Sequence, residues 1–192
     1  MTTLFIDSAT QSVYTDSRGT EEDFKNFKQF HIVKKGIYYE EAETIITGAG
    51  CLRLVEAAMY SGSLPAYTEA ETNTSLLFVT KQVNGLLVCR YKPKPTLWDK
   101  FWLFFGCSAQ NYERKDIALR DGAVLFIGSG LEYAQAAHAV LKSVIIDKEE
   151  LVNKVYEVVA TFDPHTDTRV VKYEFKVNKP EEDEEDEYAF GL

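Results

Sequence analysis

The chain has few cysteines and no long apolar run, and both shortages narrow its class. Its three cysteines, Cys51, Cys89 and Cys107, show no CxxC spacing, so neither a disulfide framework nor a zinc site is indicated. A reducing, cytoplasmic setting fits this pattern. No stretch approaches the roughly 20 apolar residues that a membrane span needs, and the N-terminus lacks the basic start and apolar run of a signal peptide. We therefore expect a soluble protein that is not exported.

Basic residues and histidines are also scarce. The net charge is -9, and the acidic run 181–187 supplies seven of the negative charges, so the rest carries only about -2. Without a basic stripe to neutralise phosphates, nucleic-acid binding is not expected. The three histidines, His31, His138 and His165, are too scattered to form a metal site. The acidic tail 179–192 is expected to be disordered, as a solvated extension rather than a docking segment for a partner.

The remaining sequence is that of one globular domain, residues 1–178. The whole chain of 192 residues is 45% hydrophobic, and no internal repeat is visible. Runs 3–6 and 12–15 flank a polar turn and predict an N-terminal hairpin, and Asn84-Gly85 predicts a second hairpin. Further strands are expected at 27–33, paired with 43–47, and at 75–80, 86–90, 123–127 and 170–177.

Three helices are predicted from apolar spacing and capping residues. Residues 51–60 are amphipathic, 131–142 are rich in alanine, and 148–161 follow Asp147, a good N-cap with Glu150 three residues later. Strands grouped around paired helices predict a layered α+β fold, in which helices cover mostly antiparallel sheets.

The start of the chain carries the first chemical signal. If Met1 is removed, Thr2 presents a hydroxyl and a free α-amine on one residue, which is a nucleophile with its own base. An α-amine titrates near pH 7.7 to 8.0 in reference peptides, which suits a general base. A Met-Thr start is common, so other segments must support this interpretation.

Four segments together carry a family resemblance. They are Thr2-Thr3, residues 13–20 (VYTDSRGT), Gly48-Ala49-Gly50 before a helix, and residues 127–137 (IGSGLEYAQAA). In this order they resemble the proteasome β-subunit family, and the last resembles its HslV-type members most. The resemblance spans roughly residues 2 to 177. It implies an N-terminal-nucleophile (Ntn) hydrolase with an αββα four-layer sandwich, in which the threonine hydroxyl attacks a peptide carbonyl while the α-amine, through a water, takes the proton.

The resemblance also assigns an ion pair beside the nucleophile. Lys28 falls at the position of the family's cation, and strand alternation favours it over Lys25. Asp16 is then the carboxylate that keeps this lysine charged. The alternative is that neither residue is catalytic, and that Asp16 is a turn residue and Lys28 a solvated strand lysine.

Other positions match the rest of the family's site. The backbone N–H of Gly50 matches the oxyanion donor at a helix start, while Gly48 and Ala49 fall where the substrate side chain binds. A serine that holds the terminal amine, and an acid with a second hydroxyl near the last helix, complete the set. These are Ser129, Asp163 and Thr166, with threonine replacing the usual serine and with Pro164 and His165 departing from the pattern.

Two features of the sequence depart from the family pattern and limit which family properties are expected here. Only one helix fits between Gly50 and Ser75, where the family has two, so one helical layer is reduced and the stacked-ring assembly does not simply follow. Residues 92–121 are an insertion containing the run 97–105 (LWDKFWLFF), which is too short to span a bilayer. This run either covers the core where the missing helix would lie or contacts another subunit.

The leading hypothesis is a proteasome-like threonine peptidase without a cofactor. It acts on peptides or unfolded proteins as a homo-oligomer, with a ring and an ATPase partner as further expectations. The alternative is a non-catalytic proteasome-like structural or binding subunit that retains Met1. An amidase with the same nucleophile is a third option.

Overall fold

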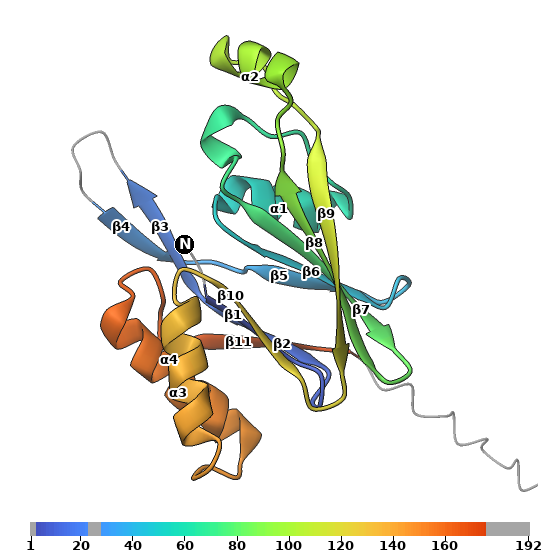
Figure 1. Ribbon diagram of the computed structural model, residues 1–192. Coiled ribbons are helices and arrows are strands. Elements are labelled where there is room, and N and C mark those ends of the chain that lie inside the picture. The colour runs from blue at the N-terminus through green and yellow to red at the C-terminus, as the bar shows by residue number, and fades with distance from the viewer. Residues whose placement is uncertain (1–2, 23–27, 176–192) are drawn as a thin grey trace, which may run out of the picture.

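The computed structural model describes residues 3–22 and 28–175 (Figure 1). The predicted N-terminal hairpin is present as β1 (Thr3–Asp7) and β2 (Ser12–Asp16). They form the centre of an antiparallel four-stranded sheet in the order β10-β1-β2-β11. Its outer strands are β10 (Val124–Gly128) and β11 (Val170–Glu174). This sheet therefore joins the start of the described chain to its end.

A second antiparallel sheet has five strands in the order β5-β6-β7-β8-β9. The strands are β5 (Gly36–Tyr39), β6 (Thr44–Ala49), β7 (Ser75–Gln82), β8 (Gly85–Pro93) and β9 (Tyr112–Arg120). The predicted Asn84-Gly85 turn joins β7 to β8. Gly85 has a φ of +134°, and a Cβ there would lie 2.0 Å from the carbonyl oxygen of Leu119, so only glycine fits the turn.

Residues 27–33 pair differently from the expectation. β4 (Lys28–Ile32) pairs with β3 (Arg18–Glu22) in a separate hairpin, whereas β6 lies between β5 and β7. In Figure 1 this hairpin projects from the body near the N-terminus. Alternation identifies a strand but not its partner, which is why the predicted pairing with 43–47 was wrong.

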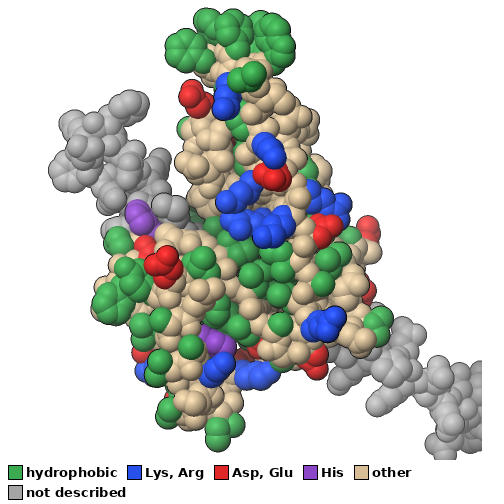
Figure 2. All heavy atoms as spheres, viewed as in Figure 1, with side chains coloured by type: hydrophobic (Ala, Val, Ile, Leu, Met, Phe, Trp, Pro, Cys, Tyr) green, Lys and Arg blue, Asp and Glu red, His purple; other side chains and the backbone are tan. Residues whose placement is uncertain are grey.

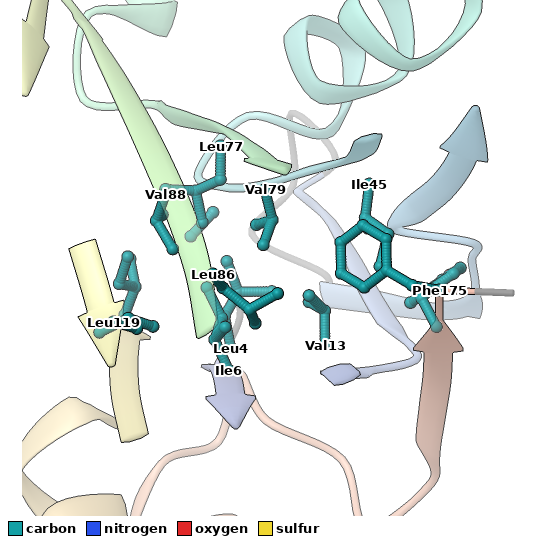
Figure 3. Close-up of a cluster of buried hydrophobic side chains, with 13 residues drawn as sticks. Leu4, Ile6, Val13, Ile45, Leu77, Val79, Leu86, Val88, Leu119 and Phe175 are labelled. Atoms are coloured by element: carbon teal, nitrogen blue, oxygen red, sulfur yellow. The ribbon is translucent and has the colours of Figure 1, made fainter. Parts of the chain in front are cut away.

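Three apolar clusters hold the elements together. The first lies between the two sheets, where Leu4 and Ile6 of β1 meet β7 and β8 side chains such as Val79 and Val88 (Figure 3). The second packs Phe5, on the opposite face of β1, against α3 (Leu131–Leu141) and α4 (Lys148–Phe162). Because successive strand residues point to opposite faces, β1 supplies both clusters.

The third cluster packs α1 (Leu52–Ser61) on the outer face of the five-stranded sheet. As expected, α1 is the one α-helix between Gly50 and Ser75; a 3-10 turn, η1 (Glu69–Glu71), follows it. The buried Glu71 accepts hydrogen bonds from the Arg53 side chain and from Thr68 N at 2.7 Å. This carboxylate therefore ties the segment after α1 back onto the first turn of the helix.

Part of the inserted segment forms an arm. β9 pairs with β8 along its full length as the edge strand of the sheet, whereas the connection between the two strands carries α2 (Leu97–Phe104) away from the body (Figure 1). Only Leu103 of this helix is buried, whereas the other large apolar side chains are 50–86% exposed. The aromatic run therefore does not cover the core. None of the described helices is long and apolar enough to cross a membrane.

Candidate active site

A buried hydrogen-bond network surrounds the start of β1. The backbone N–H of Thr3 donates to Asp16 Oδ1 at 3.1 Å, and the Thr3 hydroxyl lies 2.7 Å from the hydroxyl of Thr166. The Tyr156 hydroxyl lies 2.9 Å from the Thr3 carbonyl oxygen. Thr3 is thus held through its N–H, its carbonyl and its side chain. Thr2, the proposed nucleophile, lies outside the described residues.

Asp16 forms an ion pair with Lys35. The Lys35 Nζ lies 2.8 Å from Asp16 Oδ2, which also accepts the Arg18 N–H at 3.2 Å. Lys35 is 3% exposed and Asp16 is 0% exposed. Burial lowers the pKa of Lys35, although the Asp16 carboxylate partly offsets this, and burial likewise raises the pKa of Asp16 against the pull of Lys35.

Asp16 thus pairs with Lys35, whereas the family resemblance had pointed to Lys28. In the β3–β4 hairpin Arg18 pairs with Ile32, while Lys28 pairs with Glu22 at the far end. Four residues of strand separate Lys28 from Ile32, or about 13 Å at the usual rise. Lys35 instead lies in the short connection between β4 and β5, immediately before β5, where its carbonyl accepts a hydrogen bond from the Thr47 hydroxyl at 2.6 Å. Lys25 lies outside the described residues.

Ser129, Asp163 and Thr166 meet on the other side of Thr3. Asp163 Oδ2 accepts hydrogen bonds from the Ser129 hydroxyl at 2.5 Å and from the Thr166 hydroxyl at 2.8 Å. Burial opposes ionisation of Asp163, but these hydroxyls and the His165 N–H hold its pKa below the usual 3.8. The ionised carboxylate thus orients both hydroxyls. These residues come from the start of α3 and the segment after α4, far apart in sequence.

The network is closely packed. Gly130 lies against it, because a Cβ there would approach the Thr3 Oγ1 and Val159 Cγ1 atoms to 2.4 Å. The second glycine of Gly128-Ser129-Gly130 is therefore required by close approach. The order Lys35, Asp16, Thr3, Thr166, Asp163, Ser129 is one continuous chain of polar contacts.

The segment 48–50 leads from β6 into α1. Gly50 has a φ of +127°, and a Cβ there would lie 2.6 Å from Thr74 Cα. Gly48 is enclosed differently, since a Cβ would lie 2.7 Å from the Ser75 carbonyl oxygen and 2.8 Å from Val55 Cγ2. Close packing therefore accounts for the glycine at position 48. Ala49 and Gly50 line a cleft beside this segment, whereas Gly48 does not.

This cleft has a volume of about 170 Å³ and lies beside the start of β1. Its wall includes Ile127 and Gly128, and Gly128 pairs with Thr3 in the sheet. Two cations, Arg90 and Lys92 of β8, also line the cleft. Sequence reasoning missed both, because a basic residue near the end of a strand resembles any solvated strand residue. No group of three or more side chains suited to a metal ion occurs within residues 3–22 and 28–175.

Comparison with known proteins establishes the fold. No family model matches the sequence, and no curated protein matches it significantly. Eukaryotic HslV from Trypanosoma brucei superposes with a TM-score of 0.55 over 89% of this chain and 97% of that chain, at 13% identity. Thiobacillus denitrificans BPH, solved in complex with epoxomicin, superposes with a TM-score of 0.54 over 91% of this chain and 100% of that chain, also at 13% identity. The chain has a proteasome-type, Ntn-hydrolase-like fold. At this identity the likeness concerns the fold alone, and activity must be argued from the site.

Proposed function

We propose that the chain is a proteasome-like threonine peptidase whose nucleophile is Thr2, freed by removal of Met1. The observation that carries the proposal is the buried Lys35–Asp16 pair, whose carboxylate also binds the N–H of Thr3, the residue next to Thr2. A buried ion pair is not an efficient way to stabilise a fold, so its position beside a candidate nucleophile favours a catalytic role. The layers are proposed to form the αββα sandwich of Ntn hydrolases, with the α1 layer reduced to one helix.

In this mechanism the Thr2 hydroxyl oxygen attacks the peptide carbonyl carbon and its proton passes, through a water, to the Thr2 α-amine. The amine of the leaving peptide takes that proton as the C–N bond breaks, and water then hydrolyses the acyl ester. Lys35 takes the role first given to Lys28, because a nearby ammonium favours loss of the hydroxyl proton. Gly50 N–H is proposed to hold the oxyanion.

The remaining residues would position these groups. Ser129, Asp163 and Thr166 are proposed to hold the terminal amine and its water, as the resemblance implies. Ala49 would contact the substrate beside Gly50, while Gly48 keeps β6 close to α1.

Two linked measurements test the activity. Intact mass should show a chain that lacks Met1, and epoxomicin should add its mass to that chain. The adduct and peptide cleavage should disappear in Thr2→Ala but persist in Thr161→Ala, a control on the exposed last turn of α4. A stable mass that includes Met1, with no adduct, would favour the non-catalytic subunit, because acylation of the α-amine by methionine removes the base. An adduct without peptide cleavage would favour an amidase.

We also propose that α2 contacts a second copy of the chain. Five exposed rings lie on α2 and at its C-cap, at 50–77% exposure: Trp98, Phe101, Trp102, Phe104 and the C-cap residue Phe105. At roughly 200 Å² for each ring, they present roughly 600 Å² of apolar surface. A standard interface buries about 800 Å² on each partner, whereas the largest apolar patch of a monomer is about 300–600 Å². The arm therefore supplies most of one side of a stable interface.

Sedimentation of the full chain tests this contact. The wild type should be oligomeric at micromolar concentration, and Trp98→Ser with Phe101→Ser should dissociate it. Val83→Ser, which changes an isolated exposed residue, should not. A monomeric wild type would refute the contact, and co-sedimentation of that monomer with lipid vesicles would identify a membrane as the occupant. A ring, an ATPase partner and a cytoplasmic location remain predictions.

A further inference from the structure

Arg90 is a half-buried cation without a carboxylate partner among the described residues. Its Nη2 and Nε atoms lie 3.0 and 3.3 Å from the Ser75 hydroxyl oxygen, its recorded hydrogen-bond partner. Burial lowers the pKa of Arg90, and no neighbouring charge offsets this. A guanidinium has five N–H donors, and one hydroxyl satisfies only part of that capacity. The remaining N–H donors of Arg90 are therefore available to an anion that enters the cleft it lines.

Positive charge accumulates around this residue. Lys115 of β9 pairs directly with Arg90 across the strands, and Lys92 lies two residues along β8, on the same face. Glu113 is opposite Lys92 but lies 3.1 Å from Lys94. Figure 2 shows Lys and Arg side chains gathered across the middle of the molecule, below the α2 arm. Like charges directly opposite each other destabilise a sheet, so this arrangement is not explained by folding.

The position of Arg90 connects this charge to the candidate active site. Arg90 and Lys92 line the cleft together with residues that include Gly50 and Gly128. Gly50 carries the proposed oxyanion donor, and Gly128 pairs with Thr3. The volume of about 170 Å³ is below the 300–1,000 Å³ typical of sites for drug-sized ligands, and suits a single side chain. The cleft is therefore a compact, basic recess next to the proposed reacting groups.

We propose that this cleft binds the carboxylate of a glutamate or aspartate side chain that flanks the scissile bond of the substrate. Arg90 forms the paired N–H···O bonds that a planar guanidinium makes with a carboxylate, and Lys92 adds charge at the entrance. The inference rests on the proposed peptidase function and specifies its substrate as acidic peptides.

Cleavage preference is the first test. Internally quenched peptides carry Glu, Gln or Leu on either side of the bond, and mass spectrometry locates the cut. The wild type should cleave next to Glu with kcat/KM at least about tenfold above Gln or Leu. Arg90→Gln should remove this preference, so that the Glu, Gln and Leu peptides are cleaved with kcat/KM values within about twofold of one another. Arg114→Gln, on β9 and paired with Asp116, is the matched control and should keep the preference.

A binding test separates the subsite from catalysis. In Thr2→Ala, fluorescence anisotropy should show that a dye-labelled Glu peptide binds at least about tenfold more tightly than its Gln analogue. Arg90→Gln and high salt should both abolish the difference. If no peptide is cleaved but this difference persists, the peptidase proposal fails and the carboxylate site stands. Cleavage or binding without a Glu preference, or an equal loss for all peptides in Arg90→Gln, overturns the carboxylate site.

Discussion

Replacing Lys35 with methionine tests whether the catalytic cation is Lys35, as proposed from the Asp16 ion pair, or Lys28, as the family resemblance implies. The substitution leaves Asp16, which is 0% exposed, with hydrogen bonds from the backbone N–H groups of Thr3 and Arg18 but without a cation. Breaking a buried pair by removing one partner costs about 3–5 kcal/mol. Since domains are stable by about 5–15 kcal/mol, Lys35→Met should fold but unfold at a clearly lower urea concentration. Peptide cleavage should fall by about 10²–10³-fold, the usual cost of losing one group that stabilises developing charge.

A second substitution distinguishes catalysis from folding. Lys35→Met with Asp16→Asn removes both buried charges while the Asn oxygen still accepts the Thr3 N–H, so about 2–3 kcal/mol of stability should return. When the amide oxygen accepts the Thr3 N–H, the amide NH₂ group faces the Arg18 N–H, so that hydrogen bond is lost at a cost of about 1 kcal/mol. Activity should not return, because the ammonium is still absent.

The assays are urea unfolding followed by far-ultraviolet circular dichroism and initial rates of peptide cleavage. Lys34→Met is the matched control, since Lys34 is the exposed neighbour of Lys35 and should change neither quantity appreciably. Lys28→Met tests the sequence-based assignment. Full activity in Lys35→Met combined with loss of activity in Lys28→Met would refute the reasoning from the Asp16 ion pair.

Three further substitutions test the scaffold of the site. Tyr156→Phe removes a buried hydroxyl that lies 2.9 Å from carbonyl oxygens of both β1 and β2, and urea titration should show a loss of about 1–3 kcal/mol. Glu71→Gln should make the stability of the protein less sensitive to acid. Burial raises the pKa of Glu71, but the Arg53 guanidinium and neighbouring donors hold it below 4.5. The stabilisation by ionised Glu71 is therefore present above pH 4.5 and is lost as the pH falls towards the folded pKa. The difference in unfolding free energy between variant and wild type should therefore narrow from pH 6 to pH 3; a constant difference would contradict this sign. Gly50→Ala places a Cβ 2.6 Å from Thr74 Cα at a φ of +127°, which should cost about 1–3 kcal/mol and lower peptide cleavage, whereas an unchanged melting temperature would show that the turn is not strained.

Elements with strong local signals were predicted well. The β1–β2 hairpin, the Asn84-Gly85 turn and helices α1, α3 and α4 are present, and the Asp147 side chain caps α4 by accepting the Glu150 N–H at 2.8 Å. Each depends on residues within a few positions of one another, so periodicity and turn chemistry suffice. The three described cysteines are free, and two of them, Cys51 and Cys89, are at least partly buried.

The candidate site was predictable only in part. Asp16, Ser129, Asp163 and Thr166 lie in recognisable motifs, and the structure brings all four to Thr3. Lys35 lies just outside a strand, where side-chain alternation gives no information. Which lysine reaches Asp16 depends on how β4 pairs with β3 and how β5 pairs with β6. A shift of one residue in either pairing reverses the face of every side chain in the strand.

By itself, the sequence determined the β1–β2 and β7–β8 hairpins, helices α1, α3 and α4, and the candidate chemistry of an N-terminal threonine, because these depend on neighbouring residues. Tertiary structure alone decided that Asp16 pairs with Lys35, that α2 is exposed at the end of an arm, and that Arg90 reaches the cleft beside Gly50. These outcomes depend on the pairing of distant strands, whose free energy comes from burial and register across the whole sheet rather than from any local run of residues.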